Sequence, residues 1–68
     1  MSEHTYAVVA TVTVRQGAFY TRIPRAATVP APTAAEARKA ARALFAGEYR
    51  QKGLPVHGVS FISVARED

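Results

Sequence analysis

The chain has 68 residues, which is enough for one small domain and too short for a second. It contains no cysteine, which excludes disulfides, thiolate metal ligands and cysteine nucleophiles. Nine basic and five acidic residues give a net charge of +4, a surplus that suits a polyanionic partner and is also ordinary for a solubilising surface.

The first predicted element is a strand over about residues 5–15, a stretch rich in β-branched residues that contains no glycine or proline. Its even-numbered side chains are larger and more apolar than its odd-numbered ones. Because successive side chains of a strand point to opposite faces, the even-numbered face is predicted to pack on the core. The odd-numbered face, which includes Val9 and Thr11, is left for solvent or for a partner.

A turn and a second strand are predicted next. Gln16 and Gly17 indicate the turn, since glycine adopts a positive φ without strain. The second strand is predicted over about residues 18–29. Proline cannot donate to a sheet ladder, so Pro24 indicates either an edge position or a bulge, and we expect the strand to bend there.

A helix is predicted over about residues 34–52. Thr33 and Glu36 have the spacing of a capping box, in which each side chain bonds the backbone amide of the other. Gly53 and Pro55 are typical of the residues that end a helix. At 100° per residue one apolar sector is predicted to face the sheet, and it contains Ala34, Ala37, Ala41, Leu44 and Phe45.

A loop is predicted at His57-Gly58, followed by a third strand over about residues 59–65. These elements predict a single α+β domain over residues 1–68 with the order ββαβ. We expect a three-stranded mixed sheet in the order 2-1-3, with the helix packed on one face. The first strand takes the central place because it is the most apolar and is uninterrupted. Either Phe61 or Val59 is then expected on the open face.

This order of elements resembles the small ββαβ ribosomal proteins of the archaeal large subunit, the ribosomal protein LX type. The resemblance concerns the succession of elements across most of the chain and includes no diagnostic motif. It therefore assigns no role to any residue.

The sequence contains none of four common catalytic or cofactor-binding motifs: GxGxxG, the phosphate-binding P-loop, HExxH and the nucleophile elbow. His4 and His57 are far apart and have no clustered carboxylates, so we expect no metal site. We expect a non-enzymatic protein without a cofactor. With no signal-peptide pattern and no apolar stretch of membrane length, we also expect a cytoplasmic protein that does not bind membranes.

Two groups of residues are candidate nucleic-acid contacts. On the helix they are Arg38, Arg42 and Tyr49, with Lys39, Arg50 and Lys52 nearby. On the hairpin they are Arg15, Tyr20, Arg22 and Arg25. Arginines one helical turn apart can contact successive phosphates, and arginine interleaved with aromatic residues suits phosphate contact combined with base stacking. We expect the arginines of the two groups to form one patch. Pairing with Glu36 or Glu48 would also explain the helix group, and protection of a strand edge by charge would also explain the hairpin group.

The sequence leaves two functions open. The first is a small non-enzymatic protein whose basic surface contacts nucleic acid or a ribonucleoprotein. The second is a protein-interaction module, such as a phage or mobile-element accessory protein that binds a host factor or another acidic protein surface. A lone three-stranded sheet exposes two edges and one face, so we expect a homodimer or a partner-bound form. The residues expected at that interface are Val9, Thr11 and Phe61.

Overall fold

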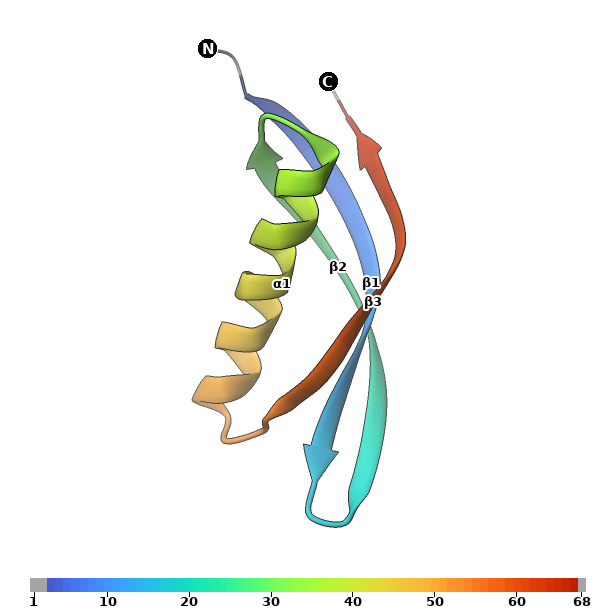
Figure 1. Ribbon diagram of the computed structural model, residues 1–68, viewed down its shortest axis with the longest axis vertical. Coiled ribbons are helices and arrows are strands. Elements are labelled where there is room, and N and C mark those ends of the chain that lie inside the picture. The colour runs from blue at the N-terminus through green and yellow to red at the C-terminus, as the bar shows by residue number, and fades with distance from the viewer. Residues whose placement is uncertain (1–2, 68) are drawn as a thin grey trace.

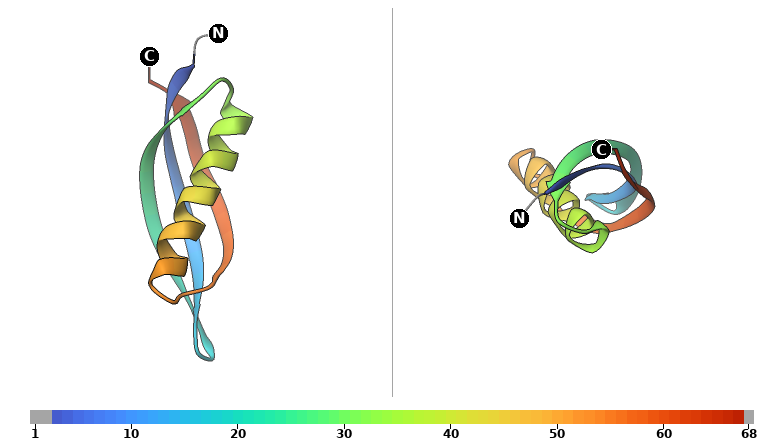
Figure 2. Two further views of the ribbon diagram at one scale, coloured as in Figure 1. Left: turned by 90° about the vertical axis from the view of Figure 1, so that its left-hand side faces the viewer. Right: turned by 90° about the horizontal axis from the view of Figure 1, so that it is seen from above.

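The computed structural model describes residues 3–67. In chain order the elements are β1 (His4–Gln16), β2 (Phe19–Ala31), α1 (Ala34–Gln51) and β3 (Val56–Arg66). The strands form one sheet in the order β2-β1-β3, and α1 lies along one side of it (Figure 1 and Figure 2). Three strands in this order and one helix confirm the small α+β class. Among the described residues, no helix has the length and apolar character needed to cross a membrane.

Both pairs of neighbouring strands are antiparallel, so the prediction of a mixed sheet is wrong. The chain does return through α1 in such a way that β3 runs in the same direction as β2. However, β1 lies between these two strands and pairs with each of them in the opposite sense. A parallel pair would require β2 and β3 to be neighbours.

The hairpin between β1 and β2 has a loop of two residues, in which the positive φ of 62° at Gly17 fits a type II′ turn. From this turn β2 pairs with β1 along its whole length without a register shift. Hydrogen-bonded and non-hydrogen-bonded pairs alternate along such a ladder. Counted from the turn, Pro24 and Pro30 both lie in non-hydrogen-bonded pairs, with Thr11 and Thr5. Neither proline removes a ladder bond, so the strand continues through Pro24.

The core lies between α1 and the even-numbered face of β1, as predicted. Val8, Ala10, Val12 and Val14 are fully buried there. On α1 the buried residues follow a spacing of four and are Ala37, Ala41, Phe45 and Tyr49. Alanine in two of these places allows the helix backbone to approach the sheet closely. Leu44, which was predicted to lie in the core, is 43% exposed, and Tyr49 is buried instead. The reason is that a spacing of four advances by about 40° per step around a helix, and the buried stripe moves away from Leu44.

Strand β3 begins at Val56, so His57 and Gly58 lie in the strand rather than in a loop. The connection from α1 is shorter than expected because Gly53, with a φ of 75°, already reverses the chain. The pairing of β1 with β3 shifts register at two places. One shift lies between Thr13 and Val14, at His57 of β3, and the other lies between Val9 and Ala10, at Ile62.

The register shift at Ile62 decides which side chains of β3 face the helix. With one extra residue at Ile62, both Phe61 and Val64 pack against the core, although their separation of three residues would place them on opposite faces of a regular strand. The prediction that Phe61 or Val59 lies on the open face is therefore wrong, because both pack against the core. Ile62 itself is 67% exposed.

Candidate nucleic-acid interface

The structure distributes the predicted nucleic-acid contacts over three separate places. Arg25 and Tyr49 lie between β2 and α1. Arg38 and Arg42 are exposed on α1, and Arg42 lies on the flank that faces β3. The register of the hairpin places Arg15, Tyr20 and Arg22 on the sheet face that points away from α1. The arginines of hairpin and helix therefore do not form the single patch that the sequence suggested.

Arg25 is held by groups of the protein itself. Its Nη1 donates to the Tyr49 hydroxyl at 3.0 Å, and its Nη2 pairs with the Glu48 carboxylate. The guanidinium lies over the rings of Phe45 and Tyr49, 5.1 and 5.4 Å from their centroids. The hydrogen bond to Tyr49, followed by that to Glu48, raises the pKa of Arg25. Tyr49 is 4% exposed, so its ring is not accessible for stacking on a base.

The alternation of side chains along β2 explains why Arg25 and Arg22 lie on opposite faces of the sheet. Arg25 is the register partner of the buried residue Ala10 and therefore points toward the helix. Arg22 pairs with Thr13, on the odd-numbered face of β1, and points away from the helix. Side chains alternate between the two faces of a strand, so Arg22 and Arg25, three residues apart, point to opposite faces. This alternation would have separated them from the sequence alone, whereas their closeness in the chain suggested one group.

The flank of α1 that faces β3 carries a line of arginines, Arg38, Arg42 and Arg50, which we call the arginine ridge. With Ala46 they occupy every fourth position of the helix, so they lie above one another along α1. All three are exposed, and none forms an ion pair within residues 3–67. The Arg42 guanidinium lies 5.7 Å from the centroid of the Phe61 ring, which directs it toward β3. Arg50 was predicted only to lie near this group, although the spacing of four places it in the same line.

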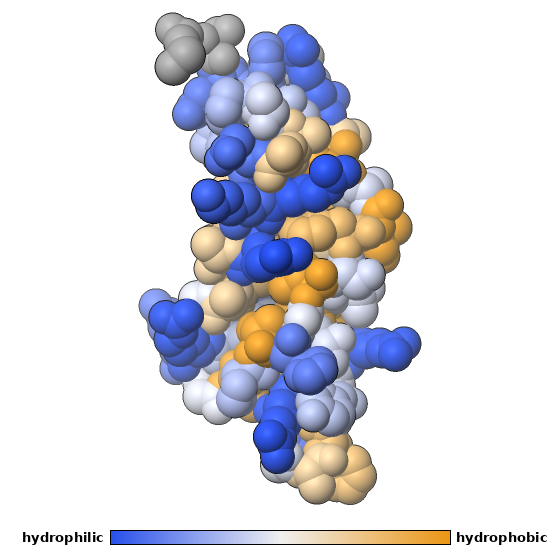
Figure 3. All heavy atoms as spheres, in the orientation of Figure 1, coloured by the Kyte–Doolittle hydropathy of each residue, from blue (hydrophilic) through white to orange (hydrophobic). Residues whose placement is uncertain are grey.

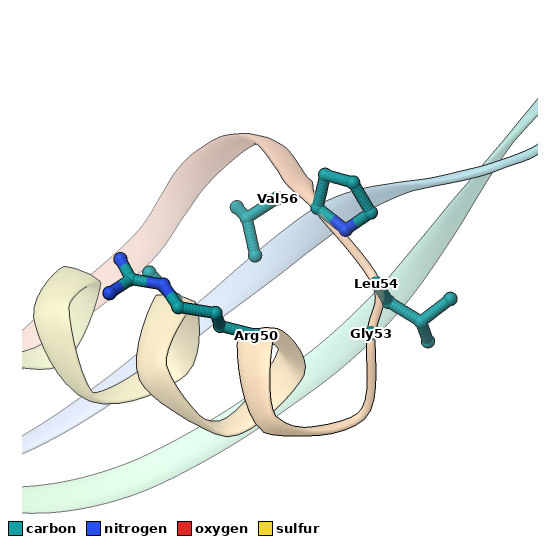
Figure 4. A pocket seen from close by; sticks show the side chains of 6 residues that line it. Arg50, Gly53, Leu54 and Val56 are labelled. Carbon is teal, nitrogen blue, oxygen red and sulfur yellow. The ribbon is translucent and has the colours of Figure 1, made fainter.

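Two adjoining hollows open between the ridge and the start of β3. The first, of about 410 Å³, is lined by Ala46, Arg50, Gly53, Leu54, Pro55 and Val56 (Figure 4). The second, of about 440 Å³, is lined by Arg42, Ala46, Val56, His57, Gly58 and Val59. Because they share Ala46 and Val56, we treat them together as the α1–β3 groove. Its lining combines apolar side chains with two guanidinium groups, and hydrophilic and apolar surface also alternate on the face seen in Figure 3.

The comparisons with known proteins were made against family models, curated proteins and solved structures. No match was found in any of the three. The resemblance in element order to small ribosomal proteins therefore gains no support from them. The chemistry of the surface has to be argued from the residues themselves.

On the open face, the hairpin end carries an aromatic and basic group made of Arg15, Tyr20, Arg22 and His57, which we call the hairpin platform. Tyr20 lies directly opposite Arg15 and is 56% exposed. Its ring centroid is 4.8 Å from that of His57. Arg15 donates from Nε to the Gly17 carbonyl at 3.0 Å, and Arg22 is exposed. His57 was not predicted to belong to this group, because the sequence placed it in a loop.

The predicted protein-interaction residues are also separated. Val9, which is 37% exposed, and Thr11 lie on the open face as expected, whereas Phe61 packs on the helix side. Among residues 3–67, no group of three or more histidine, aspartate or glutamate side chains is placed to hold a metal ion.

Proposed function

We propose that this is a small non-enzymatic nucleic-acid-binding protein that contacts phosphates through the arginine ridge. The observation that carries the proposal is that Arg38, Arg42 and Arg50 share one exposed line on α1 and have no carboxylate partner within the described residues. Guanidinium groups bind phosphate oxygens in a bidentate manner, and adjacent positions of the line are about 6 Å apart along the helix axis. Such a line can follow a phosphate backbone.

The acidic residues near α1 support this proposal by their positions. Glu48 is bound to Arg25 on the β2 flank of the helix. Glu36 lies in the first turn, where its backbone amide donates to the capping hydroxyl of Thr33 at 3.2 Å. The flank that carries the ridge is therefore left positive, and a positive surface of this kind raises the local concentration of a polyanion.

Binding to a mixed-sequence duplex across a salt series tests the proposal. Arg42→Gln is expected to flatten the slope of log K against log salt by about 0.9, the value for one phosphate contact on duplex DNA. Arg22→Gln, which removes the same charge from the opposite face of the sheet, is the matched control and should leave the duplex slope unchanged. Wild-type protein that binds neither duplex nor single strand at about 10 μM protein and 50 mM salt would refute the proposal.

One observation favours protein interaction as a second candidate function. The outer edge of β2 is interrupted by Pro24 and Pro30, whereas β3 has no proline from Val56 to Arg66. An edge without proline is open to the addition of another strand. Light scattering after size exclusion tests this candidate. A homodimer that Ile62→Lys converts to a monomer, at salt concentrations that abolish nucleic-acid binding, would support it, and a wild-type monomer at high micromolar concentration would exclude pairing between two copies.

A further inference from the structure

The arginine ridge and the hairpin platform lie on opposite sides of the sheet, and one residue connects them. His57 lines the same hollow as Arg42, and its ring also lies against the ring of Tyr20 on the platform. Tyr20 in turn lies opposite Arg15 and beside Arg22. A continuous surface thus leads from the ridge, through the α1–β3 groove and past the start of β3, to the open face.

We infer that this surface binds a single strand of nucleic acid, which runs from the arginine ridge through the α1–β3 groove onto the hairpin platform. The inference rests on the proposed function and specifies its ligand. Duplex DNA is stiff over about 150 base pairs, so it cannot turn around the edge of a sheet within a few nucleotides. A duplex can contact the ridge alone, whereas a flexible single strand can reach both sides.

Along this surface, guanidinium groups that can bind phosphates alternate with apolar and aromatic side chains that can contact bases. The ridge and the platform supply guanidinium groups for phosphates, namely Arg42 on one side and Arg22 on the other. Between them the groove presents the apolar side chains of Val56 and Val59, which suit the flat face of a base. Tyr20 then offers an exposed ring for stacking. Proteins that bind single strands without sequence preference combine a basic path with such stacking positions.

Three probes of equal length separate base contacts from phosphate contacts: oligo-dT, the same oligonucleotide with abasic sites, and a duplex. We expect oligo-dT to bind most tightly. Tyr20→Ala should weaken oligo-dT binding roughly tenfold, within the range of one lost stacking contact, and leave the abasic and duplex probes unchanged. Tyr20→Phe should retain the wild-type affinity. The matched control is Phe19→Ala, which removes a ring that is 76% exposed from the opposite strand face and should have no effect.

The charge at the far side of the path gives a second test. Arg22→Gln should flatten the salt slope for oligo-dT by about 0.7, the value for one phosphate contact on a single strand, and leave the duplex slope unchanged. Equal affinity for duplex and oligo-dT, or an equal effect of Tyr20→Ala on oligo-dT and on the abasic probe, would overturn the single-strand path. In either case, a salt slope for duplex binding that is flatter by about 0.9 in Arg42→Gln would still support the ridge. Absence of binding to all three probes would overturn both proposals.

Discussion

The two flanks of α1 use arginine in opposite ways. On the flank that faces β2, Arg25 is enclosed by the Glu48 carboxylate, the Tyr49 hydroxyl and two aromatic rings. On the flank that faces β3, Arg38 and Arg42 are exposed and have no carboxylate partner among residues 3–67, although the Arg42 guanidinium lies near the Phe61 ring. The residue type is the same on both sides, and the neighbouring groups determine whether it stabilises the fold or stays available for a ligand.

The comparison shows that the net charge of the chain is a poor guide to its binding surface. The arginine on the β2 flank already has its hydrogen bonds satisfied, so a phosphate would have to displace Glu48 or Tyr49 to bind it. The arginines on the β3 flank require no such displacement. A prediction of nucleic-acid contacts therefore has to leave out the arginines that are already bonded within the protein. In this molecule Arg25 is such a residue.

The largest effect on stability is expected for Arg25→Ala. It removes a charge-assisted hydrogen bond, an ion pair and two cation–π contacts, and it leaves the Tyr49 hydroxyl without its donor in a largely buried place. We expect the free energy of unfolding to fall by about 1–3 kcal/mol, measured by urea denaturation. Arg22→Ala, on the opposite sheet face, is the control and should change it by less than about 0.5 kcal/mol. Equal effects of the two substitutions would contradict the distinction between the flanks.

The next largest loss of stability is expected at the start of α1, the helix to which both flanks belong. The Thr33 hydroxyl accepts a hydrogen bond from the Glu36 amide at 3.2 Å. Thr33→Ala is expected to reduce stability by about 0.5–2 kcal/mol, whereas Thr33→Ser, which retains the hydroxyl, should change it little. Because this change touches neither flank, nucleic-acid binding below the melting temperature should be unchanged. A lower affinity of folded Thr33→Ala protein would show that the helix start itself contacts the ligand.

A smaller loss is expected for Glu48→Gln. The side chain keeps an oxygen that can accept from Arg25 but loses its charge, and both partners are partly exposed, with side-chain accessibilities of 25% for Arg25 and 38% for Glu48. Ion pairs in such places contribute about 0.2–1 kcal/mol. The loss should disappear when Arg25→Ala is already present, which a double-mutant cycle measures. A loss that persists in the double variant would mean that Glu48 acts through another contact.

Much of this fold could be predicted from the sequence because its signals are local. The alternation of β1, the cap at Thr33 and the glycine after α1 each depend on a few neighbouring residues. The register shift at Ile62 depends instead on how β3 fits against β1, and no local pattern indicates it. That shift turned Phe61 toward the helix and removed it from the predicted interface.

The candidate site was predicted less well, because it depends on which side chains meet across elements. The arginines of the ridge were visible in the sequence, but the bond between Arg25 and Glu48 joins residues 23 positions apart. The role of His57 as a link between the groove and Tyr20 likewise depends on the position of β3 next to β1. Pairings at such distances follow from the tertiary fold and not from spacing in the chain.

The smallest expected change in the free energy of unfolding is a gain in stability, and it tests the arginine ridge most directly. Arg38 and Arg42 are like charges four residues apart on one helix, an arrangement that costs about 0.2–0.5 kcal/mol. Arg38→Gln should therefore stabilise the protein by about that amount while it weakens duplex binding. Arg50→Gln is the control of opposite sign, because Arg50 lies in the last turn, where a cation interacts favourably with the helix dipole by about 0.3–1 kcal/mol. The changes that the two substitutions cause in the free energy of unfolding should both be smaller in 1 M salt, where the screening length falls to about 3 Å. If Arg38→Gln instead destabilises the protein at low salt, then Arg38 has a stabilising partner in the folded chain, and the two flanks of α1 do not differ in the way described.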